Sequence, residues 1–191
     1  MPQLIVIAGP NGAGKSTSAP ILLPGVLSVN EYVNADAIAQ GLSGFNPEQI
    51  AFRAGRIMLK RLQELANERL DFAFETTLAT RSFAPWITSL RLTGYRFHLI
   101  FLWLVNPELA IARVQERVRR GGHHVPEETI RRRYHAGVRN FFQLYQAIAD
   151  TWLFYDNSDP KESPIIAMGG IEIDEVIYNQ ETWNIILRGE S

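Results

Sequence analysis

The feature that most constrains this chain is a glycine-rich segment close to its start, Leu4–Thr17, which reads LIVIAGPNGAGKST. It begins with four apolar residues, a run short enough to form a buried strand. Gly9 then opens the pattern G-x-x-x-x-G-K-[ST], which Gly14, Lys15 and Ser16 complete. A strand, this loop and a following helix together wrap a chain of phosphates, so the segment predicts binding of a nucleoside triphosphate.

The chemistry of a phosphate chain accounts for this spacing. Successive backbone N–H groups must surround the phosphates, and glycines reach the unusual backbone angles that this requires. Lys15 would reach the β- and γ-phosphates, the Ser16 hydroxyl would ligate Mg²⁺, and the helix starting near Gly14 would point its positive end at the phosphates. The expected nucleotide-binding residues in this loop are Gly9, Pro10, Asn11, Gly12, Ala13, Gly14, Lys15, Ser16 and Thr17.

Composition narrows the class of protein further. The 191 residues fit one domain, 1–191, and the formal net charge of −1 gives no general attraction to nucleic acid or to a membrane. The absence of cysteine excludes disulfides and cysteine-based metal sites. No secretion signal precedes the first expected strand, and the longest apolar run, Leu99–Val105, is too short to span a bilayer. We therefore expect a cytoplasmic protein.

Beyond the loop, short apolar runs alternate with helical patterns, which indicates a parallel sheet with right-handed crossovers. The sequence predicts a P-loop NTPase of the nucleotide-kinase type. This would be a three-layer α/β/α domain with a central, mainly parallel sheet of about five strands and a small helical lid. The run Tyr95–Val105 is nearly continuously apolar and should be a central strand. The expected helices cover approximately residues 14–21, 46–69, 82–92, 106–120, 127–149 and 181–188.

Polar residues that follow the expected strands are candidates for the chemistry, because ligands bind at the carboxyl ends of parallel strands. Asp36 is the leading general base for an acceptor hydroxyl, although it could also cap a helix. Glu75 could orient the acceptor or hold a magnesium-bound water, or be the structural partner of an arginine. Thr76 and Thr77 would offer hydroxyl and N–H groups to the acceptor. Asn157 is a candidate for the adenine pocket, and a simple strand-end turn explains it equally well.

Arginines are concentrated in one segment, approximately 113–135, in which a Gly-Gly sequence separates two expected helices. Guanidinium groups match phosphate geometry, and a mobile lid could bring them in when both substrates are bound. We expect Arg117 and Arg120 before the glycines and Arg133 after them to contact the γ-phosphate. The alternative is a solvated helix surface with nearby glutamates as partners.

With these elements in order, the chain resembles the zeta-toxin-like family of P-loop kinases over roughly residues 3–158. The resemblance depends on the loop together with VNAD ending at Asp36, FETTL around Glu75, GGHHVP at 121–126 and YDNS at 155–158. It implies an ATP-dependent kinase in which Asp36 is the base, Lys15 and the lid arginines contact the γ-phosphate, and Glu75 lies near the acceptor. Toxins of this family phosphorylate UDP-N-acetylglucosamine and are held inactive by an antitoxin. Toxin members typically carry an arginine three residues after the base, where this chain has Ala39.

Three hypotheses follow from the sequence. The first is an ATP- and Mg²⁺-dependent kinase acting on a hydroxyl of a small molecule, with UDP-N-acetylglucosamine as a candidate acceptor. The second is an ATP-binding interaction module of a toxin–antitoxin type system with little turnover. The third is a nucleic-acid 5′-hydroxyl kinase, which the neutral overall charge disfavours.

Overall fold

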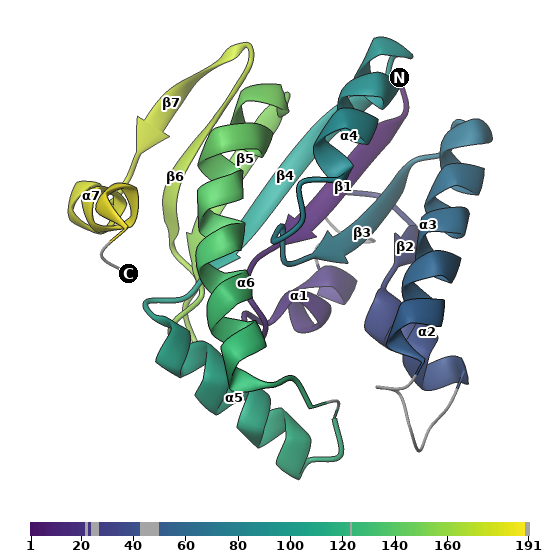
Figure 1. Ribbon diagram of the computed structural model, residues 1–191. Helices are drawn as coiled ribbons and strands as arrows, with labels where there is room; N and C mark the ends of the chain where they lie inside the picture. The colour runs from purple at the N-terminus through teal and green to yellow at the C-terminus, as the bar shows by residue number, and fades with distance from the viewer. Residues whose placement is uncertain (22, 24–26, 43–49, 123, 190–191) are drawn as a thin grey trace.

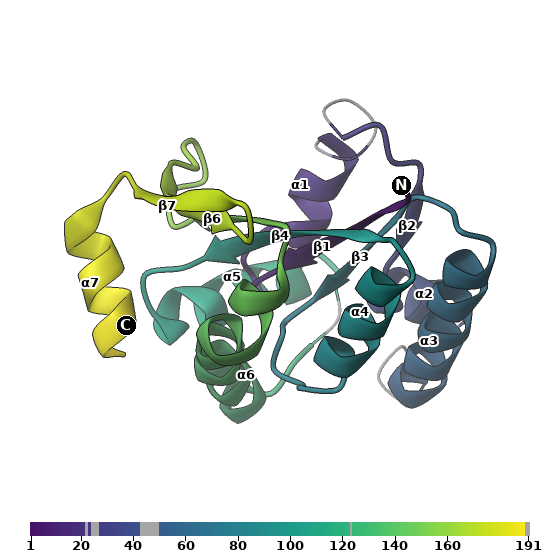
Figure 2. The ribbon, with the colours of Figure 1, turned by 90° about the horizontal axis from the view of Figure 1, so that it is seen from above.

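The computed structural model of the chain has three layers, with a seven-stranded sheet between two layers of helices (Figures 1 and 2). It describes all residues except 22, 24–26, 43–49, 123 and 190–191. The strands run in the order β2-β3-β1-β4-β5-β6-β7. Their bounds are β1 Gln3–Ala8, β2 Glu31–Val33, β3 Phe72–Thr76, β4 Arg96–Trp103, β5 Thr151–Asp156, β6 Ile165–Gly170 and β7 Ile173–Ile177.

The first five strands are parallel, as the alternation of strands and helices predicts, and β6 and β7 extend the sheet in antiparallel pairing. The sequence predicts about five strands, whereas the sheet has seven. The two further strands, β6 and β7, form a C-terminal hairpin. Strand β4 has three strands on either side of it, which confirms that the apolar run 95–105 is central. Five consecutive residues of β4, from Leu99 to Trp103, are buried.

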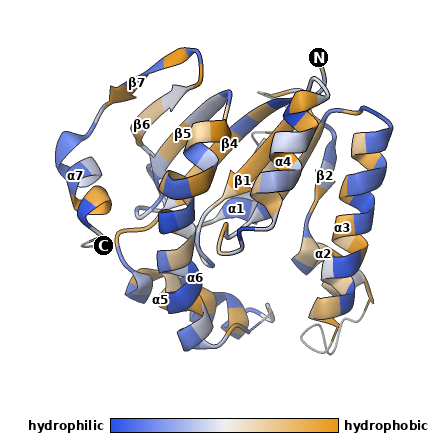
Figure 3. Ribbon diagram, turned by 45° about the horizontal axis from the view of Figure 1, so that its top comes forward, coloured by the Kyte–Doolittle hydropathy of each residue, from blue (hydrophilic) through white to orange (hydrophobic). Residues whose placement is uncertain are grey.

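Alternate residues of β1 face opposite layers, which explains why this strand is apolar throughout. Leu4 and Val6 pack with residues of α3, α4 and the end of α6, whereas Ile5 and Ile7 pack with residues of α1 and α5. Figure 3 shows the resulting concentration of hydrophobic residues along the central strands. The helices are α1 Lys15–Ile21, α2 Ala35–Leu42, α3 Ala51–Asn67, α4 Phe83–Leu92, α5 Pro107–Arg119, α6 Glu127–Asn140 and α7 Gln180–Arg188.

Two expected helices differ from those observed. The expected helix 127–149 is regular only to Asn140, where a π-helical turn, Phe141–Tyr145, and a 3₁₀ turn, Gln146–Ile148, follow. The π-helical turn brings Phe141 into contact with aromatic rings of β4 and β5, and burying those rings outweighs regular helix geometry. The expected start of the helix 46–69 lies outside the described residues. No helix in the described part of the chain is both long and apolar enough to cross a membrane.

Candidate active site

The phosphate-binding loop connects β1 to α1 at the carboxyl edge of the sheet, as the sequence predicts. Gly9 has a φ of 136°, and a β-carbon there would collide with the carbonyl oxygen of Leu102 on β4. Gly12 has a φ of 79°, and a β-carbon there would lie 2.8 Å from the carbonyl oxygen of Ala110 on α5. Glycine is therefore required at both positions, both for the backbone angle and for the close approach of neighbouring backbone.

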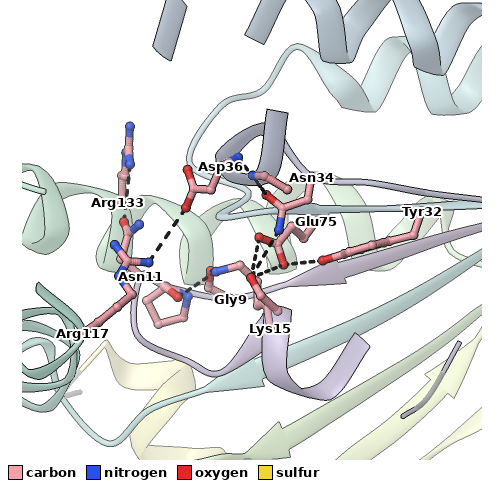
Figure 4. A network of polar contacts seen from close by, with 12 residues as sticks. Gly9, Asn11, Lys15, Tyr32, Asn34, Asp36, Glu75, Arg117 and Arg133 are labelled. Atoms are coloured by element: carbon pink, nitrogen blue, oxygen red, sulfur yellow. Dashed lines mark hydrogen bonds and ion pairs between the residues drawn. The ribbon is translucent and has the colours of Figure 1, made fainter. Parts of the chain in front are cut away.

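Lys15 folds back over the loop instead of extending into solvent. Its ammonium group donates to the carbonyl oxygens of Gly9 and Pro10, each at 2.9 Å (Figure 4). Burial lowers the pKa of Lys15 to about 8, an effect that the negative charges of Glu75 and Asp36 oppose. The side chain thus holds a positive charge that is poorly solvated, which is the condition in which an anionic ligand binds it most favourably.

Glu75 accepts hydrogen bonds from two hydroxyl groups at the end of β3. Ser16 donates to its carboxylate oxygens at 2.9 and 3.0 Å, and the Tyr32 hydroxyl donates to Oε2 at 2.6 Å (Figure 4). The side-chain amide of Asn34 lies 3.3 Å from the Ser16 hydroxyl. Burial, together with the charge of Glu75, raises the pKa of Tyr32, so its hydroxyl stays a donor. No local sequence pattern marks Tyr32, because its contact with Glu75 depends on the pairing between β2 and β3.

Asp36 is the second residue of α2, and only Asn34 separates this helix from β2. Its backbone N–H donates to the Asn34 side chain at 2.7 Å, so Asn34 caps this helix. The Asp36 carboxylate faces the cavity and lies 3.8 Å from a guanidinium nitrogen of Arg117, as Figure 4 shows. About half of the Asp36 side chain is exposed (49%), which leaves its carboxylate accessible to a ligand.

Two of the three predicted arginines lie at the same site. Arg117 on α5 meets Asp36, and Arg133 on α6 lies 3.5 Å from the side-chain oxygen of Asn11 in the loop. Burial lowers the pKa of Arg133, and the carboxylate of Asp36 opposes this shift. Arg120 is not at the site, because its side chain is 78% exposed and pairs with Glu116 at 2.9 Å.

These residues line one cavity of about 500 Å³ at the carboxyl edge of the sheet, together with Glu75, Thr76 and Thr77. The sequence predicts that these residues lie close together, because each of them follows an expected parallel strand. The residues that line the cavity are Asn11, Gly12, Gly14, Lys15, Ser16, Thr17, Asn34, Ala35, Asp36, Ala39, Ala51, Met58, Glu75, Thr76, Thr77, Phe83, Arg113, Arg117, Val125 and Arg133.

Asn157 and Arg113 brace the loop from behind. The Asn157 side chain donates to the carbonyl of Ala13 and accepts from Ser163, so its polar atoms are engaged by the protein itself. Arg113 donates to the carbonyl oxygens of Asn157 at 2.8 Å and Ser158 at 2.7 Å, and reaches that of Gly12 at 3.5 Å. The sequence offered no sign of these contacts, which join residues up to 144 positions apart.

The segment after β3 forms a fixed wall of the cavity. Leu78 has a φ of 53° although it is fully buried, and its N–H donates to the hydroxyl of Thr76 at 3.1 Å. The buried amide of Asn140 donates to the carbonyl of Leu78 at 2.7 Å. Gly137 allows α6 to approach the carbonyl of Thr77, where a β-carbon would collide. These contacts hold the backbone of Thr76 and Thr77 in place.

Several known proteins are similar to this chain in sequence or in fold. An uncharacterized protein of Haemophilus influenzae is 28% identical over 132 residues, which are 69% of this chain and 92% of the relative. The crystal structure of AvrRxo1-ORF1:-ORF2 with ATP superposes with a TM-score of 0.77 at 14% identity, covering 97% of this chain but only 63% of that one. A structure of the PezAT toxin–antitoxin system of Streptococcus pneumoniae superposes with a TM-score of 0.60 at 19% identity, covering 85% and 70% of the two chains.

At these identities the two superpositions show the fold alone. The family is shown by sequence, because the zeta toxin family model matches residues 1–161 of the 191. That match includes the phosphate-binding loop, Asp36, Glu75 and the three arginines that line the cavity. The chain therefore belongs to the zeta toxin family.

Proposed function

We propose that this protein is an ATP-dependent kinase that transfers the γ-phosphate to a hydroxyl group of a small molecule. The observation that carries the proposal is the cavity, in which two carboxylates, those of Asp36 and Glu75, lie together with a phosphate-binding loop and four basic side chains. These are the side chains of Lys15, Arg113, Arg117 and Arg133. Phosphoryl transfer requires this combination, since one side must neutralise phosphate charge and the other must activate the acceptor. The AvrRxo1-ORF1:-ORF2 complex was crystallised with ATP, which supports ATP as the donor here.

Each group has a defined part in the proposed reaction. The oxygen of the acceptor hydroxyl attacks the γ-phosphorus while Asp36 accepts the proton of that hydroxyl. The bond between the γ-phosphorus and the oxygen that bridges it to the β-phosphate breaks, and ADP is released. Lys15, Arg117 and Arg133 stabilise the negative charge that spreads over the transferred group. Glu75, Thr76 and Thr77 hold the acceptor against the loop. The Arg117–Asp36 pair, at 3.8 Å, would loosen as phosphate and acceptor take its place.

The donor set at Ser16 fits Mg²⁺ held partly by substrate phosphates. A hydroxyl and a carboxylate, from Ser16 and Glu75, lie together at the end of the loop, and both are oxygen ligands. When bound, the ion would supply positive charge to the phosphates. Among the described residues, no group of three or more His, Asp or Glu side chains is arranged to hold a metal by itself.

Segment 113–135, which contains the last turns of α5 and the first part of α6, is the proposed lid. Helix α5 contributes Arg113 and Arg117 to the cavity, α6 contributes Arg133, and the Gly-Gly sequence lies between the two helices. Closure would exclude water once both substrates are bound, and so favour transfer over hydrolysis.

The test is transfer of ³²P from γ-labelled ATP to a panel of sugar nucleotides, nucleosides and free sugars, with wild type compared with Asp36→Ala. UDP-N-acetylglucosamine belongs in the panel because the family resemblance implies it. We expect label on an acceptor with the wild type, and a loss of about 10²- to 10⁴-fold in the variant with ATP binding retained. Tight ATP binding with no transfer by either protein would reject the kinase.

A partner protein is the second element of the proposal. The PezAT structure is that of a toxin–antitoxin system, which supports an antitoxin-like protein that binds this chain as well. The variant Asp36→Ala distinguishes a kinase from an ATP-binding module without turnover. A kinase would lose phosphate transfer in this variant. A module would have no transfer to lose, and it would still bind both ATP and its partner.

A further inference from the structure

Two side chains from one edge of the sheet meet the end of the phosphate-binding loop. Strand β2 is only three residues long and stands at the end of the strand order, paired with β3. Tyr32 lies on this strand and Asn34 follows it, so the two are two positions apart and share a face. Val33 between them packs in the opposite layer. Tyr32 donates to Glu75 and Asn34 donates to Ser16, and Figure 4 shows both side chains pointing toward Glu75.

The hydroxyl group of Ser16 has one proton and two lone pairs for its contacts. The proton is directed at the Glu75 carboxylate, whose oxygens lie 2.9 and 3.0 Å away. One lone pair accepts the amide N–H of Asn34, at 3.3 Å. Because these contacts use the proton and one lone pair, the second lone pair is left for a ligand. A cation bound there would meet an oxygen whose orientation is already set.

Tyr32 fixes Glu75 as Asn34 fixes Ser16. A glutamate side chain rotates about several bonds, so a carboxylate with a single partner would adopt more than one position. The Tyr32 hydroxyl holds Oε2 at 2.6 Å and comes from a different segment of the chain than Ser16 does. The carboxylate is therefore held between β2 and the loop. Hydrogen bonds from residues behind the ligands orient such ligands, and their loss typically lowers cation affinity by about 10- to 100-fold.

Asn34 also connects this place to the candidate base. Its side-chain oxygen accepts the backbone N–H groups of Asp36, at 2.7 Å, and of Ala37, at 3.2 Å. The oxygen must face these two donors, so the amide nitrogen faces the other way, toward Ser16. One short side chain thus holds both the first turn of α2, which carries Asp36, and the hydroxyl group of Ser16.

We propose that Tyr32 and Asn34 are positioning residues for the divalent cation that accompanies the nucleotide. They hold Glu75 and Ser16 in a ligating arrangement before the nucleotide binds, and Asn34 keeps Asp36 next to that arrangement. The proposal rests on the proposed kinase function, in which Mg²⁺ is held partly by the phosphates of ATP. Neither residue belongs to the glycine-rich motif, so a strand outside the motif completes the cation site.

The experiment measures the affinity of the full chain for a non-hydrolysable ATP analogue by calorimetry, once with saturating Mg²⁺ and once with EDTA. The ratio of the two affinities reports how strongly the cation is held. Tyr32→Phe and Asn34→Ser should each lower this ratio about tenfold and leave the affinity in EDTA within about twofold of that of the wild type. Serine keeps a side-chain oxygen to cap α2, so the helix start is preserved.

Two matched controls lie far from the cavity, in the C-terminal part of the chain. Tyr178 is an exposed tyrosine, and Asn179 caps α7 by accepting the N–H of Thr182 at 3.0 Å. Tyr178→Phe and Asn179→Ser are the same changes at these positions and should leave the ratio as in the wild type.

Three results would overturn the proposal. An unchanged ratio in Tyr32→Phe and Asn34→Ser would show that neither residue acts on the cation. Equal losses of affinity with Mg²⁺ and with EDTA would show a distorted loop instead. A wild type whose affinity does not respond to Mg²⁺ would reject the cation site itself. These measurements do not depend on phosphate transfer, so the kinase stands or falls separately in the labelling experiment.

A second comparison tests whether Asn34 acts through Ser16. Ser16→Ala removes the hydroxyl group that Asn34 contacts and should itself lower the ratio. In that background Asn34→Ser should lower the ratio further by less than about twofold, because its contact is already lost. Tyr32→Phe acts through Glu75 and should still lower the ratio there, which shows that a loss can be detected. A further loss of about tenfold with Asn34→Ser would contradict its assigned action on Ser16.

Discussion

The two sides of the cavity are assembled in different ways. The proposed phosphate side is built mainly from one continuous stretch, residues 9–17, with arginines added from α5 and α6. The proposed acceptor side collects side chains from α2, α3, β3 and α4, which are spread over tens of residues. A recurring ligand such as a phosphate chain can be bound by a short local motif. A variable ligand such as the acceptor requires a surface that only the folded chain brings together.

The largest expected effect is on the phosphate side alone. Lys15→Met should lower kcat by about 100- to 1,000-fold, because the transferred group loses a buried positive charge. Thermal unfolding should show no loss of stability, since burial of the ammonium group opposes folding at neutral pH. Lys60→Met, on an 80% exposed side chain of α3, is the matched control and should leave kcat unchanged. Equal losses in both variants would show that Lys15 has no special part in transfer.

The next effect concerns the acceptor side. Asn140→Ala removes the buried donor to Leu78 and should lower the free energy of unfolding by about 1 to 3 kcal/mol. It should also raise KM for the acceptor more than KM for ATP, because the freed backbone is that of Thr76 and Thr77. Asn67→Ala at the exposed end of α3 is the control for unfolding. If KM for ATP rose as much as KM for the acceptor, the contact between Asn140 and Leu78 would not act on the acceptor side alone.

A third test of the phosphate side measures how the affinity of the wild type for an ATP analogue depends on pH. With the Lys15 pKa at about 8 in the free protein, the ammonium group is charged below that pH and neutral above it. Bound phosphate favours the charged form, so affinity for a non-hydrolysable ATP analogue should be flat just below pH 8. Above pH 8 it should fall by up to about tenfold per pH unit. Calorimetry across this range measures it, and Lys15→Met should abolish the fall. A flat profile in the wild type would contradict the lowered pKa.

The smallest effect is expected where the two sides meet. Tyr32→Phe removes the hydrogen bond to Glu75 but leaves that of Ser16, so the carboxylate loses one of its two hydroxyl donors. We expect transfer to slow by about two- to fivefold, in line with the loss of one hydrogen bond at a partly solvated site. Steady-state kinetics measure the change, with Tyr178→Phe, on an exposed tyrosine, as the control. A loss as large as that in Lys15→Met would assign Tyr32 a direct part in transfer.

The parts of the molecule that could be predicted are those fixed by local patterns. The strand–loop–helix unit around Lys15 follows from glycine spacing, and the central position of β4 follows from its unbroken apolar sequence. Asp36 and Glu75 could be placed at one edge of the sheet because parallel strands share that edge. These predictions require no knowledge of the contacts between distant segments of the chain.

The parts that could not be predicted depend on contacts between distant segments. Arg113 and Arg120 stand in the same arginine-rich segment, yet one braces the loop and the other pairs with Glu116 at the surface. Helix phase alone does not distinguish them, since what matters is which residues α5 meets. The position of Asn157 after a strand suggests a nucleotide contact, but its side-chain partners are Ala13 and Ser163. Its place in an adenine pocket therefore stays a prediction.

The C-terminal hairpin has a practical consequence for anyone who divides this protein by homology. The family match ends at residue 161, just before β6, but β6 covers the outer edge of β5. Trp183 of α7 is buried and stacks on Trp152 of β5 with ring planes 4° apart. A fragment trimmed to the matched residues would expose a long apolar strand edge of the kind that pairs with other copies of itself. For expression and crystallisation, the smallest useful piece extends through α7.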